Sequence, residues 1–269
     1  MRPQDFDTLS TMLKRQSGLV LTMDKAYLLE SRLTPVARKW NLAGVAELAE
    51  ALRLRNDPVQ LRDVTEAMTV NETFFFRDKR PFDLFEQIML PAMIKARTTK
   101  RALRIWSAAA SSGQEAYSLA MLIKERGPEL AGWTIDIVGT DLSSEMVERA
   151  QTGVYTSFEV QRGMPVKLLV KYFTRSGDKW QIAPMIRSGV QFRRHNLLHD
   201  FTLLGHFDIV FCRNVLIYFD VETKGKILQA IRKQMPADGY MVLGAAETVM
   251  GITDTFAPVV GSPGLYRPH

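Results

Sequence analysis

The sequence predicts an α/β protein with a largely parallel, doubly wound sheet, a small all-helical N-terminal domain and an inserted antiparallel β flap. Up to about residue 90, apolar residues recur only at the spacing of helices. From Leu103 onwards, short apolar runs typical of buried strands alternate with helical segments. Between Gly153 and Gly189, aromatic and basic residues around a turn interrupt this alternation, which indicates the flap.

The composition is that of a globular protein, with 46% hydrophobic and 24% charged residues in a chain of 269. No apolar run approaches the roughly 18 residues that span a bilayer, and acidic residues stand where a signal peptide would be apolar. The single Cys212 excludes an intrachain disulfide. These features favour a cytoplasmic protein without membrane insertion. The net charge of +6 would suit nucleic acid, anionic lipid or an acidic protein, or would simply aid solubility.

Residues 1–88 are expected to form the helical domain and a linker. A first helix carries its apolar residues at 6–13 and ends at Gly18. A second begins after Thr22 or Asp24, and Pro35 should kink or divide it. The third and fourth helices cover 45–52 and 61–68, with a turn at 56–58 between them.

Residues 89–269 are expected to form the sheet domain. Its predicted strands are 103–107, 134–141, 190–193, 207–211 and 239–243. Helices follow at 115–125, after the capping Ser143, and from Asp220 to Met235. A hairpin around 261–264 closes the chain. The β subdomain spans about 155–190, with its turn at 176–178.

Ligands of a doubly wound sheet bind beyond the carboxyl ends of its strands. A run of small residues, 108–113, follows the first strand and precedes Glu115. It lacks the Gly-Lys-Ser/Thr ending of a P-loop, so triphosphate binding is not expected. Asp141 ends the second strand and either accepts ribose hydroxyls or caps the next helix. Asn196 and Asn214 follow later strands, as ligand contacts or as turn formers.

The sequence shows no hydrolytic or metal-binding constellation. His195 and His199 are four residues apart, but no helical pattern and no acidic partner support a zinc site. Cys212 ends a buried strand and is expected to pack rather than react. We therefore predict no metal centre and no nucleophilic catalysis.

Four blocks in order resemble one family, the CheR chemotaxis receptor methyltransferases, over nearly the whole chain. They are residues 69–78 (TVNETFFFRD), 106–118 (WSAAASSGQEAYS), 136–143 (DIVGTDLS) and 211–219 (FCRNVLIYF). Ala109 and Ala110 depart from the glycine or cysteine frequent in that family. The resemblance implies a Rossmann-like, class I methyltransferase domain that uses S-adenosylmethionine and releases S-adenosylhomocysteine.

The resemblance also implies a substrate and residue roles. The substrate would be glutamate side chains on the cytoplasmic helical domain of chemotaxis receptors, which become methyl esters. Arg77, Arg213 and Tyr218 would position the substrate, although a packed Tyr218 is an equal alternative. The residues implied in cofactor binding are Asn71, Thr73, Arg77, Glu115, Asp141, Asn196, Leu197, Asn214 and Val215.

A glutamate carboxylate is ionised near neutrality, since its reference pKa is about 4.3, so this chemistry requires no general base. Basic residues of the N-terminal helices, Arg53 and Arg55 among them, would face an acidic receptor, and the flap could accept a receptor tail as an added strand. Two alternatives are a nucleic-acid methyltransferase on the same fold and a non-catalytic cofactor-binding adaptor. No amino-methylating or Pro-Cys motif supports the first, so no nucleic-acid partner is expected.

Overall fold

The computed structural model describes all 269 residues, which form two compact units. Unit 1 comprises residues 1–70 and 218–223, and unit 2 comprises 71–217 and 224–269. Residues 71–88 are expected from the sequence to belong to the first domain as a linker, whereas they lie in unit 2. The reason is their apolar content, because Phe75, Phe82 and Phe85 are buried in the core of unit 2.

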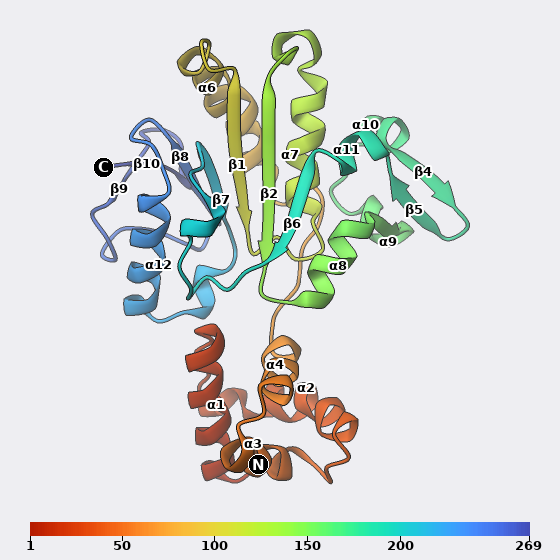
Figure 1. Cartoon of the computed structure of the whole chain (residues 1–269), viewed down its shortest axis with the longest axis vertical. Coiled ribbons are helices and arrows are strands. Elements are labelled where there is room, and N and C mark those ends of the chain that lie inside the picture. Colours follow the sequence, from red (N-terminus) through yellow and green to blue (C-terminus); the bar gives the residue numbers. More distant parts are fainter. The chain divides into compact units, whose positions relative to one another are not determined.

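Unit 1 is built from four helices and one 3-10 turn, in agreement with the predicted helical domain (Figure 1). They are α1 (Pro3–Ser17), η1 (Met23–Lys25), α2 (Ala26–Lys39), α3 (Val45–Arg55) and α4 (Pro58–Ala67). Gly18 ends α1 in the left-handed conformation, with a φ of 77°. The side chain of Asp57 caps α4 by accepting from the backbone N–H groups of Val59 and Gln60.

Helix α2 runs unbroken through Pro35, so the division predicted there does not occur. A proline inside a helix costs about 3 kcal/mol or more. Leu29, Leu33 and Val36 are buried on both sides of it, and each such side chain contributes about 1.5–3 kcal/mol when removed from water. Burial of the apolar face therefore outweighs the missing hydrogen bond.

Unit 2 contains a seven-stranded sheet in the order β6-β2-β1-β7-β8-β10-β9 (Figure 1). The first five strands in this order are mutually parallel. Strand β10 pairs antiparallel with both of its neighbours, β8 and β9. The strands are β1 (Ala102–Ala108), β2 (Thr134–Asp141), β6 (Val190–Arg194), β7 (Ile209–Cys212), β8 (Tyr240–Leu243), β9 (Phe256–Pro258) and β10 (Leu265–Pro268). The predicted doubly wound sheet and its closing hairpin are confirmed.

Helices precede and connect these strands. They are α5 (Arg80–Leu84), the π-helical turn η2 (Phe85–Met89), α6 (Leu90–Ala96), α7 (Gln114–Glu125), α8 (Ser144–Thr152) and α12 (Val221–Lys233), with 3-10 turns η3 (Gly127–Leu130), η4 (Thr202–Leu204) and η5 (Leu216–Tyr218). The hydroxyl of Ser143 accepts from the N–H of Met146 and caps α8, as predicted. Asp220 accepts from the N–H of Thr223 at the start of α12.

The predicted antiparallel flap is confirmed as a three-stranded sheet in the order β3-β5-β4. Its strands are β3 (Val154–Thr156), β4 (Phe173–Ser176) and β5 (Lys179–Ile182), and three short helices not expected from sequence accompany them: α9 (Ser157–Gln161), α10 (Val166–Tyr172) and α11 (Pro184–Arg187). The ring of Phe75 packs edge-on against Tyr155 at 5.0 Å and Phe173 at 5.5 Å, between ring centroids. This aromatic cluster joins the flap to the segment that begins unit 2.

Candidate functional site

The strand order reverses at β1, which lies between β2 and β7. Ala108 of β1 is in register with Thr140 of β2 and with Cys212 of β7. The residues that follow, Ala109, Asp141 and Arg213, therefore leave the sheet at one level. This is the topological switch point, where doubly wound sheets bind their ligands.

The loop after β1 turns sharply into helix α7. Ala109 and Ser111 adopt positive φ angles of 55° and 50°, and Gly113 has a φ of 93°. A Cβ on Gly113 would lie 2.8 Å from the ring of Phe192, so both the backbone angle and the space require glycine there. The loop brings its backbone and the open amide groups of the helix start to the switch point.

Asp141 organises this loop from the end of β2. Its carboxylate accepts from the N–H of Ser111 at 2.8 Å and from the N–H of Ser143 at 2.9 Å. The residue is 7% exposed. Ribose binding by Asp141 stays a prediction.

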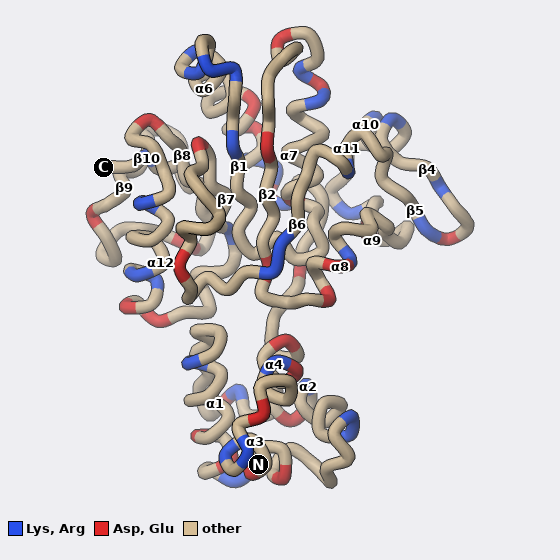
Figure 2. The backbone as a smooth tube through the Cα atoms, in the orientation of Figure 1, with Lys and Arg blue, Asp and Glu red and all other residues tan.

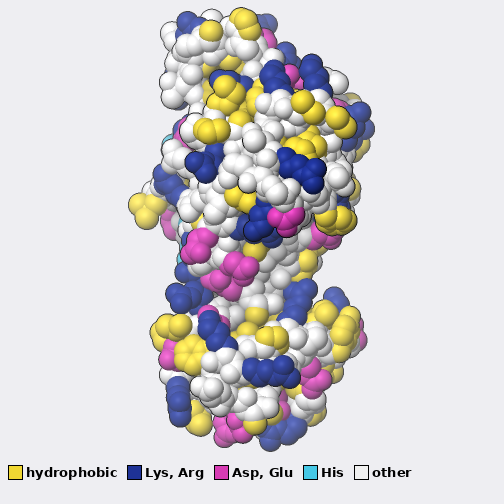
Figure 3. Space-filling model, turned by 90° about the vertical axis from the view of Figure 1, so that its right-hand side faces the viewer, with side chains coloured by type: hydrophobic (Ala, Val, Ile, Leu, Met, Phe, Trp, Pro, Cys, Tyr) yellow, Lys and Arg dark blue, Asp and Glu magenta, His cyan; other side chains and the backbone are white.

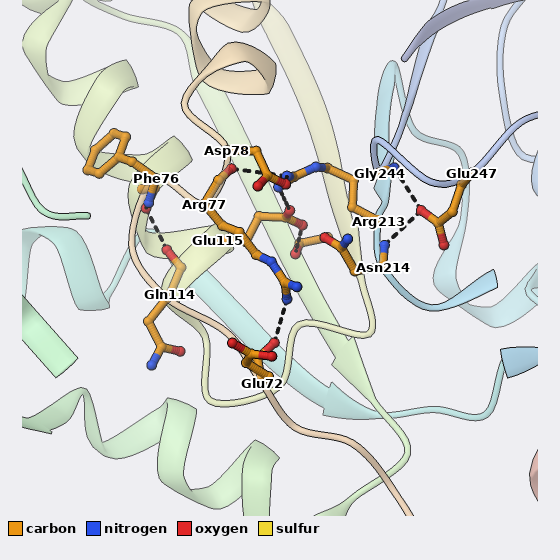
Figure 4. Close-up of polar contacts among 12 residues, drawn as sticks. Glu72, Phe76, Arg77, Asp78, Gln114, Glu115, Arg213, Asn214, Gly244 and Glu247 are labelled. Atoms are coloured by element: carbon orange, nitrogen blue, oxygen red, sulfur yellow. Dashed lines mark hydrogen bonds and ion pairs between the residues drawn. The ribbon is translucent and has the colours of Figure 1, made fainter. Parts of the chain in front are cut away.

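The buried guanidinium of Arg213 stands at the centre of a charge cluster (Figure 4). Its Nη1 donates to Glu115 Oε2 at 2.7 Å, and its Nη2 donates to Asp78 Oδ2 at 2.7 Å and to the carbonyl of Arg77 at 3.0 Å. The side chain is only 2% exposed. Ser107 donates its hydroxyl to the other oxygen of Glu115 at 2.7 Å. Glu115 is thus held by one residue of β1, Ser107, and by the residue that follows β7, Arg213.

The segment 71–78 lies along the same strand ends. The carbonyl of Asn71 accepts from the hydroxyl of Ser111 at 2.9 Å, and the N–H of Phe76 donates to the hydroxyl of Ser118 at 3.1 Å. Arg77 donates to the carbonyl of Glu72 at 2.6 Å. These contacts bring Asn71 to the loop of Asp141, and the carbonyl of Arg77 lies beside the Arg213 guanidinium that pairs with Glu115. Thr73 lies between Asn71 and Arg77 in the chain.

Sequence reasoning missed Glu247, which follows β8 and holds the loop after β7. Its carboxylate accepts from the backbone N–H groups of Asn214, Val215, Leu216 and Gly244, at 2.7 to 2.9 Å. Figure 4 shows the bonds from Asn214 and Gly244. Asn214 has a left-handed φ of 58°, which turns the chain so that three successive N–H groups face one carboxylate. A lone glutamate after a strand carries no recognisable sequence signal.

The remaining candidates fall in three places. The N–H of His195 donates to the carbonyl of Asp141 at 2.8 Å, which brings Asn196 and Leu197 next to the end of β2. Tyr218 belongs to unit 1, where its carbonyl accepts from the N–H of Val20. Cys212 is fully buried, and burial raises the pKa of its thiol well above the usual range. A neutral, enclosed thiol agrees with packing rather than nucleophilic chemistry.

This sheet topology, with its switch-point loop and acidic strand end, is that of the class I S-adenosylmethionine-dependent methyltransferases. Residues 71–264 match the family model for the CheR methyltransferase SAM binding domain, and residues 4–69 match that for the CheR methyltransferase all-alpha domain. The chain belongs to the CheR methyltransferase family. Its cofactor is therefore S-adenosylmethionine, and the small-residue loop, Asp141 and the open helix start at the switch point suit such a ligand.

Curated relatives extend over almost the full length. The chain is 43% identical to chemotaxis protein methyltransferase 1 of Pseudomonas aeruginosa, over 98% of this chain and 97% of that protein. It is 39% identical to chemotaxis protein methyltransferase Cher2 of Pseudomonas putida, over 97% and 96%. It is also 39% identical to the chemotaxis protein methyltransferase of Vibrio parahaemolyticus, over 97% and 95%. No helix in the structure has the length and apolar character needed to cross a membrane.

Proposed function

We propose that this chain transfers the methyl group of S-adenosylmethionine to glutamate carboxylates on the cytoplasmic helical domain of chemotaxis receptors, and acts in the cytoplasm. The observation that carries the proposal is the match of both units to chemotaxis methyltransferases along nearly the whole chain. The receptor adaptation role of such relatives supplies the substrate class. The glutamate ester is the finer part of the proposal.

The chemistry agrees with the groups at the strand ends. A glutamate carboxylate oxygen takes the methyl group in line with the departing sulfur, and S-adenosylhomocysteine and a methyl ester result. No proton has to be removed from an ionised carboxylate. The protein's task is then to align the reactants and to exclude water.

Two arginines divide this task in the proposed mechanism. Both terminal nitrogens of Arg213 are engaged by Glu115, Asp78 and the carbonyl of Arg77. It thus acts on the substrate through the segment it holds. Arg77 is only half-buried, and its guanidinium donates to the backbone carbonyl of Glu72. Its guanidinium is the better candidate to orient the incoming carboxylate, because bidentate pairing with carboxylates suits arginine.

We further propose that Asn71, Thr73, Glu115, Asp141, Asn196, Leu197, Asn214 and Val215 contact the cofactor. Of these, Asp141 is assigned the ribose, and Asn196 and Leu197 the adenine. Tyr218 is proposed to face the substrate from the end of η5.

Labelled S-adenosylmethionine tests the substrate directly. The protein is incubated with receptor-bearing membranes, and in parallel with tRNA and with DNA. We expect label on the receptor alone, released as methanol in mild base, since methyl esters are base-labile. Label on nucleic acid would support the alternative methyltransferase, and cofactor binding without any transfer would support a non-catalytic adaptor.

The receptor-binding surface is proposed to include the exposed Arg53 and Arg55 of α3. Basic and acidic residues are interspersed along both units rather than gathered in one stripe (Figure 2). The test must therefore compare the effect of reversing these two arginines with that of reversing another pair of basic residues. Reversing both charges should slow receptor methylation without weakening cofactor binding. Reversal at Lys95 and Lys100, an exposed pair in unit 2, makes the same charge change and should leave the rate unchanged. Equal losses in both variants would contradict a specific surface.

The flap is proposed to receive a receptor tail. Strands β3 and β4 are the edges of its three-stranded sheet, and an edge strand can pair with an added peptide. Exposed basic and apolar side chains are intermixed on the face shown in Figure 3. Removing the tail of a receptor should raise its KM with little change in kcat if the tail serves as a tether.

A further inference from the structure

The loop after β7 is tied to the loop after β8 by a single carboxylate. Glu247 Oε2 accepts from the N–H groups of Asn214 and Gly244, each at 2.7 Å. Oε1 accepts from the N–H of Val215 at 2.9 Å and from that of Leu216 at 2.7 Å. Both oxygens therefore receive two donors, and the residue is only 9% exposed.

Gly244 is part of the same arrangement. A Cβ at this position would lie 2.7 Å from Glu247 Oε2, 2.9 Å from Asn214 Nδ2 and 3.0 Å from Asn214 N. Its φ is not in the left-handed region, so space rather than backbone conformation demands glycine. Gly244 and Glu247, both far from Asn214 in sequence, thus together allow the close approach of the carboxylate to this loop.

We propose that Glu247 is a positioning residue for methyl transfer. It presets the loop of residues 213–216 so that Asn214 and Val215 face the cofactor before it binds. The inference rests on the proposed cofactor contacts of those two residues. Glu247 itself accepts hydrogen bonds from backbone N–H groups of the protein, so it acts through the loop.

The chemistry of the side chain explains why a carboxylate is needed. Four N–H donors require an acceptor at both ends of the group, and a carboxylate supplies two equivalent oxygens. Glutamine supplies one oxygen and one NH2, so one pair of N–H groups would face another donor. Buried N–H groups without acceptors are costly, and the left-handed turn at Asn214 would relax to satisfy them.

Two variants test the proposal, each with a matched control. Glu247→Gln removes one acceptor, and Gly244→Ala crowds the carboxylate without changing it. The controls are Glu148→Gln, an exposed glutamate, and Gly225→Ala, a buried helical glycine whose Cβ would meet nothing closer than 3.5 Å. We expect the dissociation constant of S-adenosylhomocysteine, measured by calorimetry below the unfolding transition, to rise about tenfold in both test variants, a loss of about 1.4 kcal/mol.

A merely structural role would lower the unfolding temperature and leave that dissociation constant unchanged in the folded fraction. Affinities within twofold of the parent protein in a folded test variant would overturn the proposal. Glu247→Asp, which keeps the charge on a shorter side chain, should recover part of the affinity lost in Glu247→Gln. No recovery at all would count against the carboxylate as the essential feature.

Hydrogen exchange on the unmodified protein gives a test that no folding failure can obscure. The amides of Asn214, Val215 and Leu216 should already exchange slowly without ligand, since Glu247 holds them. Fast exchange that slows only when S-adenosylhomocysteine binds would show that the ligand orders the loop, and would overturn presetting.

The variant Asn214→Ala separates this inference from the proposed function. Unchanged affinity in that variant would refute the cofactor contact, whereas absence of receptor methylation by the parent protein would refute the proposed function alone.

Discussion

Replacing Arg213 with methionine should destabilise unit 2 strongly. The side chain is 2% exposed and pairs with Glu115, whose side chain is 12% exposed, and with Asp78, whose side chain is 43% exposed. Methionine leaves the Glu115 carboxylate buried without its cation, and still hydrogen-bonded to the hydroxyl of Ser107. Breaking a buried ion pair in this way costs about 3–5 kcal/mol. The half-exposed Asp78 can be hydrated instead, and its share is at most about 1 kcal/mol.

The expected loss is therefore about 4 kcal/mol in the free energy of unfolding. For a unit of this size, each kcal/mol lowers the midpoint temperature by roughly 2–4 °C, which gives a fall of about 8–16 °C. The assay is unfolding in urea and by heat at pH 7, followed by circular dichroism. The double variant with Glu115→Gln should be more stable than the sum of the single losses predicts, because it leaves no uncompensated buried charge there.

Two results would refute this reasoning. One is a loss below about 1 kcal/mol for Arg213→Met, which is the range of a surface pair. The other is strict additivity in the double variant, which would mean that Arg213 and Glu115 do not interact energetically.

Three further predictions concern unit 2. Asp141→Ala should lower the calorimetric affinity for S-adenosylmethionine about a hundredfold, since two charge-assisted hydrogen bonds to ribose are lost; unchanged affinity would rule out ribose binding. The Arg97 guanidinium holds the pKa of Asp238 below its usual value of 3.8, so the stabilisation exists above about pH 4 and is lost as the pH falls through the lowered pKa. Asp238→Asn should thus be less stable than the parent at pH 7 and equal to it in strong acid. A difference in unfolding free energy that persists in strong acid would show that it does not come from the Asp238–Arg97 ion pair. Gly139→Ala should cost about 1–3 kcal/mol, because its Cβ would lie 2.6 Å from the ring of Phe192; an unchanged urea midpoint would show that the ring moves freely.

The strands were predictable because each is short, apolar and bounded by polar or small residues. Strand β2 spans the predicted 134–141, and β1 and β6 each extend the prediction by one or two residues. The three short helices of the flap were not predicted, because four to seven residues carry too few apolar repeats for a helical period. The division predicted at Pro35 does not occur, since packing on both sides of it keeps α2 continuous.

The strand-end candidates were predictable from connectivity alone. Parallel strands present their carboxyl ends at one edge, so Glu115, Asp141 and Asn214 had to lie near the switch point once the strands were recognised. The same logic does not reveal what each side chain contacts. The pairing of Arg213 with Glu115 depends on the packing of β7 beside β1, which are separated by about a hundred residues.

The sequence by itself therefore determined the order of elements, the doubly wound class and the residues at the strand ends, because local apolar patterns and chain connectivity fix these. Tertiary structure alone decided that residues 71–88 pack with unit 2, that Arg213 is enclosed between two carboxylates, and that Glu247 holds the loop of Asn214. The physical reason is that these contacts join residues far apart in the sequence. A buried carboxylate or guanidinium satisfies whichever partners the fold brings within about 3 Å, and that proximity leaves no periodic trace in the chain.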